Sequence, residues 1–477
     1  MTLKVFNRFT GHKEDFEPVH EGRVGIYFCG MTVQDKPHMG HMLAFVAGDM
    51  IRRYLRFRGL EVTYVQNFTD IDDKIIARAN DEGVDYSVVA ERNIGEYFRF
   101  ASELNILPAD VYPKATEHIA DIIALIERLV EKGYAYQGGP DVYYRVRRFG
   151  QYGKLSGRRV DDLRSGARID VGDAKEDPLD FTLWKGAKEG EPAWDSPWGP
   201  GRPGWHIECS VMSMKYLGET LDMHGGGMDL VFPHHENEIA QSEAATGSEY
   251  VRYWMHNGLL NLSGEKMSKS TGHFFLIEDI LKEFSGEVVR FYFLSTHFRS
   301  NSEFGRERLR EAAAGFERIH EFCLGLDEAA SAAPGRAPAG ADGGQLLTLA
   351  GEVRSDFLAA MDDDFNSAEA IGHLFRLIRE VNALTGGDTA ALAAVPGAVS
   401  RLLEDFGVYD SILGLFRGGL PRASADVPAG IAALVRERDE ARAAKDWERA
   451  DEIRARVLEA GYVIEDRPGG AKVKPAK

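Results

Sequence analysis

Residues 24–66 read VGIYFCGMTVQDKPHMGHMLAFVAGDMIRRYLRFRGLEVTYVQ, and this stretch decides the fold class. The apolar run at 24–29 predicts a buried strand, and a turn-rich loop then leads into a helical pattern that closes at Gly59. A second strand is predicted over 61–66. Strand, helix and strand in so short a span indicate a right-handed βαβ crossover, and therefore a parallel sheet.

Ligands of such sheets bind beyond the carboxyl ends of the strands. Cys29 and Thr69 follow two neighbouring predicted strands, so both are expected on that rim. His38 and His41 open the helix between the strands, where free N–H groups and the helix dipole favour anions such as a triphosphate. Two polar histidines that only cap the helix would give the same tetrapeptide.

Residues 204–238 gather many chemically active side chains in GWHIECSVMSMKYLGETLDMHGGGMDLVFPHHENE. Pro233 can open a helix in which His234 and Glu238 lie four residues apart on one face. On its own that spacing is more often a surface pair. Together with the thiols of Cys209 and Cys29 it predicts a site suited to zinc.

Residues 257–273, NGLLNLSGEKMSKSTGH, predict a mobile loop that carries two ammonium groups. Loop lysines are usually only solvated. The spacing of Lys266 and Lys269 with two serines, combined with the histidines upstream, favours phosphate contacts instead.

The remaining chain divides by composition. Residues 112–200 read as an inserted segment that ends in a loop rich in Gly, Pro and Trp. From 304 onward helical patterns predict a bundle, interrupted by the low-complexity stretch 329–344. A second linker at 417–429 precedes a charged tail with helix-turn-helix character.

Overall composition limits the functional classes. A chain of 477 residues with 44% hydrophobic and 28% charged residues is typical of a soluble protein of several domains. Neither a membrane-spanning run nor the plan of a signal peptide is visible, and three cysteines suit the reducing cytoplasm. The net charge of −18 argues against a protein that coats nucleic acid without specificity. The tail from 424 to 477 is neutral, which makes it the better candidate for an RNA contact, although solvated helix faces would give the same charge balance.

Two of these motifs together resemble a known family. HMGH at 38–41 and KMSKS at 266–270 look like the two signatures of class I aminoacyl-tRNA synthetases. Their companions resemble the cysteinyl-tRNA synthetases, and the resemblance covers nearly the whole chain: FCGMTV at 28–33, NFTDIDDKII at 67–76, GWHIECS at 204–210, HGGGMDLVFPHHENE at 224–238, DDDFN at 362–366 and KDWERADEIR at 445–454.

The resemblance implies an α/β protein with a Rossmann-type parallel-sheet catalytic domain and an insertion, followed by an α-helical bundle and a small C-terminal anticodon-binding domain. The implied divisions are the two halves of the catalytic domain at 1–111 and 201–260, the inserted connective segment at 112–200, the KMSKS loop and stem-contact region at 261–303, the helical bundle at 304–417 and the anticodon-binding domain at 424–477.

The family's site residues transfer to matching positions. One zinc ion per chain would be held by Cys29, Cys209, His234 and Glu238. ATP would be bound by His38, Gly40, His41, Asp229, Lys266 and Lys269, of which the histidines and lysines would be catalytic. Thr69, Trp205 and His224 would line the amino-acid pocket.

The implied reaction joins L-cysteine to ATP, with Mg²⁺, and then transfers the cysteinyl group to tRNA(Cys). A monomer is expected. Cysteine and serine differ by sulfur for oxygen, which an apolar pocket separates poorly, while aminoacylation needs a ratio of about 10⁴. A zinc ion that accepts the substrate thiolate would supply this discrimination without a separate editing site.

Two other functions share some of these features. A cysteine ligase that transfers cysteine to a small amine, as in mycothiol synthesis, would match the catalytic half equally well, but it needs no bundle or charged tail. A silent zinc-containing RNA-binding module would be expected to lose a signature motif, and both are intact. Departures from the family pattern are Met39 in the first signature, His273 after the second, and a C-terminus without tryptophan.

Overall fold

The structure is a computed structural model that describes residues 2–163, 174–262, 265–266, 275–332, 342–423, 429–467 and 470–475. The chain forms two compact units. The first comprises Met1–Phe316, Gly351–Arg376 and Val408–Arg417, and the second comprises Glu317–Ala350, Leu377–Gly407 and Gly418–Lys477.

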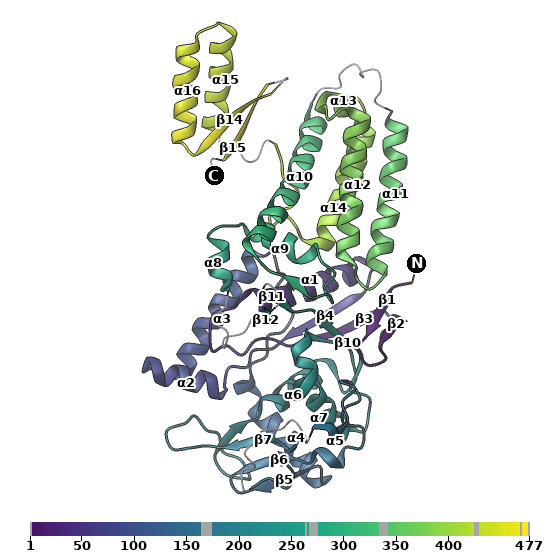
Figure 1. The fold of residues 1–477 in the computed structure, drawn as a ribbon, viewed down its shortest axis with the longest axis vertical. Coiled ribbons are helices and arrows are strands. Elements are labelled where there is room, and N and C mark those ends of the chain that lie inside the picture. Colours follow the sequence, from purple (N-terminus) through teal and green to yellow (C-terminus); the bar gives the residue numbers. More distant parts are fainter. Residues whose placement is uncertain are drawn as a thin grey trace. The chain divides into compact units, whose positions relative to one another are not determined.

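A four-stranded, all-parallel sheet forms the centre of the first unit (Figure 1). Its strand order is β10-β9-β3-β4, with β3 at Arg23–Phe28, β4 at Glu61–Gln66, β9 at Leu221–Gly227 and β10 at Val251–Asn257. Helix α1 (Met39–Phe57) connects β3 to β4, which pair in parallel from Arg23↔Glu61 to Phe28↔Gln66. The expected βαβ unit and α/β fold class are therefore confirmed.

Helix α1 is buried along most of its length because it packs against β4 on one side and against α9 (Gly286–Leu294) on another. Asp49, at the middle of α1, is fully buried and accepts hydrogen bonds from three guanidinium groups, those of Arg52, Arg53 and Arg290. Arg290 also donates to the carbonyl oxygen of Leu413 at 2.7 Å. A buried carboxylate is tolerated there because every oxygen is paired with a cation.

The inserted segment carries an antiparallel sheet of its own, in the order β5-β6-β7-β8. Its strands are Ala135–Gly138, Asp141–Tyr144, Phe181–Gly186 and Gly201–Pro203, and α4 (Ile119–Glu131) shares an apolar core with them. Sequence composition had given no strand pattern for most of this region. The core includes Trp184 and Ile207, so it continues into the helix that follows the insert.

A loop of the insert is hydrogen-bonded to the start of α7 (Glu236–Thr246). The buried carboxylate of Glu236 accepts hydrogen bonds from the backbone N–H groups of Gly153 and Ser156, at 2.8 and 2.9 Å. Beside it, the Tyr152 hydroxyl donates to the side-chain oxygen of Asn237. The loop at 152–156 therefore belongs to the same packed structure as α7.

The other elements of the first unit lie around the sheet. They are the hairpin β1–β2 (Lys4–Asn7 and His12–Asp15), α2 (Asp73–Glu82), α3 (Tyr86–Glu103), α5 (Val160–Leu163), α6 (Trp205–Leu217), α8 (Ile277–Leu281) and a small sheet of β11 (Leu260–Leu262), β12 (Glu265–Lys266) and β13 (Ser302–Glu303).

Helices follow, as the sequence predicts. Four are long, α10 (Arg306–Ser331), α11 (Gly343–Asp362), α12 (Ser367–Thr385) and α14 (Pro396–Leu413), and α13 (Thr389–Ala393) is a short one between the last two. The C-terminal segment forms α15 (Ala429–Ala443) and α16 (Trp447–Glu459), which share a small apolar core with a hairpin of β14 (Tyr462–Arg467) and β15 (Gly470–Pro475) (Figure 1). The helices were expected and the hairpin was not. Within the described residues, no helix is both long and apolar enough to span a bilayer.

Candidate active site and metal centre

A cavity of about 320 Å³ opens at the carboxyl edge of the parallel sheet. The chain segments that follow all four strands contribute to its lining, through Cys29, Thr69, Asp229 and Gly258. His38, Gly40 and His41 from the start of α1 also line it, as do Trp205 and Cys209 from α6. The site lies where ligands of open parallel sheets bind.

The first turn of α1 is closed by its own histidines. The His38 ring accepts from the His41 N–H at 3.2 Å, and the His41 ring accepts from the His38 N–H at 3.4 Å. The two rings stack with their centroids 3.5 Å apart. The histidines therefore cap the helix, as one of the two interpretations of this motif expects, and they also line the cavity.

Burial determines the charge of these two rings. It lowers the pKa of His38 to about 4, although the nearby Asp229 carboxylate opposes the shift. Burial also lowers the pKa of His41 well below its usual value, and the His38 ring adds to the effect. At neutral pH both imidazoles are uncharged, so a ring N–H of each can donate to an anion, and the positive N-terminal end of the α1 dipole lies beside them.

Beside this cavity, four buried donor groups come within 4.8 Å of one another: Cys29, Cys209, His234 and Glu238. The sulfur atoms of Cys29 and Cys209 are 3.9 Å apart. Two zinc–sulfur bonds of about 2.3 Å at a tetrahedral angle would place sulfurs about 3.8 Å apart. The donor set and its spacing fit a metal ion of the zinc type.

The electrostatics of the cluster agree with this fit. A hydrogen bond from the Cys29 thiol lowers the pKa of Cys209 to about 6, and His234 assists. Burial alone would lower the pKa of His234, but the Glu238 carboxylate and Cys209 outweigh it and raise that pKa to about 10. The cluster therefore stabilises positive charge at its centre, whether a proton or a metal ion supplies it.

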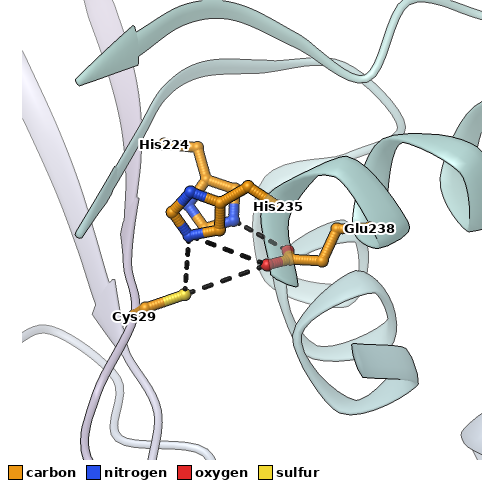
Figure 2. Close-up of side chains that lie close together, drawn as sticks. All are labelled: Cys29, His224, His235 and Glu238. Carbon is orange, nitrogen blue, oxygen red and sulfur yellow. Dashed lines mark hydrogen bonds and ion pairs between the residues drawn. The ribbon is translucent and has the colours of Figure 1, made fainter. Parts of the chain in front are cut away.

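A second group of four donors overlaps the first. Figure 2 shows Cys29, His224, His235 and Glu238 converging beside the end of β3. His224 Nε2 lies 2.8 Å from Glu238 Oε2, and its Nδ1 lies 3.2 Å from the carbonyl oxygen of Tyr27. Neither His224 nor His235 lines the cavity, whereas Cys209 and His234 of the first group do. We therefore assign His224, which contacts Glu238, the task of orienting that carboxylate.

His234 is held differently, and its position favours the first group. Its Nδ1 lies 2.9 Å from Nδ1 of His206, while its Nε2 lies 3.1 Å from Glu238 Oε1. One ring nitrogen is thus fixed by a neighbour and the other points into the cluster, as is usual for a histidine ligand. His235 is fastened behind the site, with Nδ1 2.7 Å from Nε2 of His256.

The helix start at this site differs from the expected one. A helix was predicted from Pro233, whereas α7 begins at Glu236 and residues Val231–His235 form a separate irregular turn. Phe232 is extended, with φ −140° and ψ 131°, because a residue before proline avoids the helical region. His234 and Glu238 nevertheless meet.

The structure places most of the predicted site residues around one cavity. Those that line it are Cys29, His38, Gly40, His41, Thr69, Trp205, Cys209, Asp229 and His234. Glu238 lies directly behind them, and His224 is fully buried behind Glu238 instead of lining the cavity. Lys269 and His273 fall outside the described residues, as does the side chain of Lys266.

Gly30 and Asn67 were not singled out from the sequence, although both adjoin predicted site residues. The Gly30 N–H donates to Asn67 Oδ1 at 2.9 Å. A Cβ atom on Gly30 would lie 1.6 Å from the carbonyl oxygen of Asn67. The ends of β3 and β4 approach so closely that only glycine fits between them.

Gly30→Ala should therefore disrupt the site. We expect a lower melting temperature, with destabilisation of about 3 kcal/mol, and a loss of adenylate formation, since backbone atoms must shift. The matched control is Gly95→Ala within α3, where a Cβ meets no atom within 4 Å. That variant should be neutral or slightly more stable. Equal melting temperatures and activities for the two variants would contradict the close approach.

The parallel sheet, the cavity at its carboxyl edge and the histidine-capped helix together define the catalytic domain of a class I aminoacyl-tRNA synthetase. Residues 15–314 match the family of class I (C) tRNA synthetase catalytic domains. Residues 356–417 match the DALR domain, and residues 424–473 match the cysteinyl-tRNA ligase anticodon binding domain.

Relatives that match over the full length identify the family within this class. The chain is 51% identical to the cysteine–tRNA ligase of Geobacter sp. (strain M21), over 99% of this chain and 100% of that one. It is 52% identical to the cysteine–tRNA ligase of Geobacter sulfurreducens, with the same coverage. The chain belongs to the cysteine–tRNA ligase family.

Solved structures agree on the fold. Methionyl-tRNA synthetase from Mycobacterium tuberculosis in complex with methionyl-adenylate aligns with a TM-score of 0.65 at 15% identity, over 83% of this chain and 92% of that one. A putative arginyl-tRNA synthetase from Campylobacter jejuni aligns with a TM-score of 0.56 at 13% identity, over 84% and 94%.

Proposed function

We propose that this protein is a cysteine–tRNA ligase that uses ATP to form cysteinyl-adenylate and then transfers the cysteinyl group to tRNA(Cys). It would act in the cytoplasm as a monomer. The observation that carries this proposal is that a cluster of two thiols, an imidazole and a carboxylate borders a cavity at the carboxyl edge of the sheet. Cys29, Cys209 and His234 line the cavity, so the donors face the place where a substrate would bind.

Cys29, Cys209, His234 and Glu238 would hold one zinc ion. When bound, zinc would accept the side-chain sulfur of the amino acid and favour it over the neutral hydroxyl of serine. The protein contributes the orientation of the donors. His206 fixes one nitrogen of His234, and His224 holds Glu238.

ATP would bind across the start of α1 and the segment after β9. His38, Gly40 and His41 would hold the triphosphate through the ring N–H groups of the uncharged imidazoles and the positive end of the helix dipole, and Asp229 would bond the ribose. Lys266 and Lys269 would bring positive charge to the phosphates, with Mg²⁺ bound to the nucleotide. No side-chain nucleophile is needed, because the amino-acid carboxylate would attack the α-phosphate directly and pyrophosphate would leave as the bond between the α- and β-phosphates breaks.

The amino-acid pocket would be formed by Thr69 and Trp205. The Trp205 ring packs on His234, with ring centroids 4.3 Å apart, so it lies next to the metal centre. It can cover the bound side chain from the solvent side, and so exclude water from the reacting carboxylate.

The match of residues 424–473 to an anticodon binding domain supports tRNA as the acceptor. A ligase for a small amine would have no use for such a domain.

Pyrophosphate exchange tests the proposal, followed by transfer to tRNA. We expect exchange that depends on cysteine, with serine at least about 10⁴-fold less effective, and charging of tRNA(Cys). Exchange without charging would favour a small-amine ligase. An absence of exchange would favour a binding module.

Zinc affinity should also depend on His224. His224→Ala removes the group that orients Glu238, so we expect zinc to bind about 10–100-fold more weakly. Competition with a chelator measures this directly. His118→Ala is the control, because His118 is equally buried but bonds Lys114 and Tyr216 instead. Unchanged zinc affinity in His224→Ala would contradict the orienting role.

A further inference from the structure

The hydroxyl group of Thr69 is fixed from two directions. Its backbone is tied to the loop after β3, because Thr69 N–H donates to the carbonyl oxygen of Met31 at 3.3 Å and its carbonyl oxygen accepts from Val33 N–H at 3.2 Å. Its side chain then donates to Glu208 Oε2 at 2.8 Å. Thr69 is 2% exposed, so water has little access to that hydrogen bond.

Glu208 lies on α6, in the turn between Trp205 and Cys209, and is 1% exposed. Thr69 lines the cavity proposed for the amino acid, whereas Glu208 does not. Glu208 thus holds Thr69 from behind. Among the described residues, Thr69 is the one hydrogen-bond donor to its carboxyl group.

This arrangement determines what the Thr69 oxygen can recognise. A hydroxyl group has one hydrogen to donate and two lone pairs that accept. Because its hydrogen is directed to Glu208, only lone pairs remain for a ligand in the cavity. Such an oxygen suits a group that carries N–H donors, and the ammonium group of an amino acid carries three.

We propose that Glu208 is a positioning residue for the amino-acid ammonium group, which it serves by fixing the Thr69 hydroxyl as an acceptor. The inference rests on the proposed function, since it requires an amino acid in this cavity. It adds a residue that acts through Thr69 and makes no contact with the substrate itself.

The role does not require a particular charge on Glu208. Burial and the neighbouring Cys209 raise the pKa of its carboxyl group, while the Thr69 hydrogen bond opposes the shift. A carboxyl group keeps an acceptor oxygen whether or not it carries a proton. A glutamine side chain keeps one as well, and this makes the proposal testable.

Two substitutions of Glu208 test whether its acceptor oxygen, rather than the volume of its side chain, holds the Thr69 hydroxyl. Glu208→Met removes the acceptor at similar volume and frees the Thr69 hydroxyl to turn. We expect the KM for cysteine in pyrophosphate exchange to rise about tenfold, with kcat, the KM for ATP and the zinc content little changed. Glu208→Gln retains an acceptor and should restore the KM to within about threefold of the original.

A double-mutant cycle shows whether Glu208 acts through Thr69. Thr69→Val removes the hydroxyl, so adding Glu208→Met to it should raise the KM for cysteine no further. If Glu208→Met does not fold, Glu208→Ala removes the same acceptor and takes its place in the cycle.

Several outcomes would overturn the proposal. The first is an unchanged KM for cysteine in Glu208→Met, and the second is an equal rise of that KM in Glu208→Gln. The third is a double variant in which Glu208→Met and Thr69→Val multiply each other's effects on the KM. The fourth is loss of zinc in Glu208→Met. Failure of the proposed function is distinguishable, because the unsubstituted protein would then show no cysteine-dependent exchange at all.

Discussion

Cys209→Ser is expected to lose zinc and cysteine activation together. A serine hydroxyl is a poor zinc ligand beside a thiolate, and Cys209 is the thiol whose pKa is lowered to about 6. Groups that only orient a ligand are worth about 10–100-fold in affinity, so loss of a ligand should cost at least about 100-fold in cysteine-dependent pyrophosphate exchange. Metal content by atomic spectroscopy and exchange on the same preparation measure both effects.

The matched control for this substitution is Cys323→Ser. Cys323 is also fully buried, but it lies in α10, far along the chain from the cluster. It should keep both zinc and exchange. If Cys209→Ser retained cysteine-dependent exchange as a metal-free protein, the selection of cysteine by zinc would have to be abandoned.

Asp49→Asn is expected to destabilise the first unit by about 3 kcal/mol, because it leaves three guanidinium groups around a neutral amide. For a unit of this size the melting temperature should fall by about 4 °C. Asp121→Asn is the control, since its ion pair with Lys215 is about half exposed and should matter little. Equal melting temperatures for the two variants would refute the structural role of Asp49.

The ion pairs of Asp49 also predict that the stability of the fold depends on pH. The coulombic attraction of the three arginines, Arg290 foremost, outweighs burial and holds the pKa of Asp49 well below its usual range. A carboxylate with a lowered folded-state pKa stabilises the fold fully above its unfolded pKa of about 4, and this contribution is lost as the pH falls further. The stability difference between the unsubstituted protein and Asp49→Asn should therefore be full at pH 7 and smaller at about pH 3.5.

Local patterns were sufficient to predict the catalytic fold. The apolar runs and the helical pattern at 24–66 predicted β3, α1 and β4, because strand and helix patterns can be recognised within a few residues of sequence. Two strand ends on the same rim then brought Cys29 and Thr69 to one cavity, as the rule for parallel sheets requires. The antiparallel sheet of the insert was missed because its strands are short and because β6 and β7, which pair with each other, lie far apart in the sequence.

Contacts between residues that are far apart in the sequence could not be predicted in this way. The choice between His234 and His224 as a ligand depends on which ring lines the cavity. His224 lies behind Glu238 instead, and its Nδ1 contacts the carbonyl oxygen of Tyr27, 197 positions earlier in the chain. The partnership of Thr69 and Glu208 likewise spans 139 positions. For these residues spacing along the chain carries no information, and only packing decides.

The loop at 152–156 limits how much of the inserted segment can be deleted. Deleting the whole insert would leave the Glu236 carboxylate buried without the two backbone donors that it now has, two residues from Glu238. Burying an unpaired carboxylate is costly enough to displace the start of α7. Any truncation of the insert therefore has to retain residues 152–156, which hold the start of α7 beside the candidate metal site.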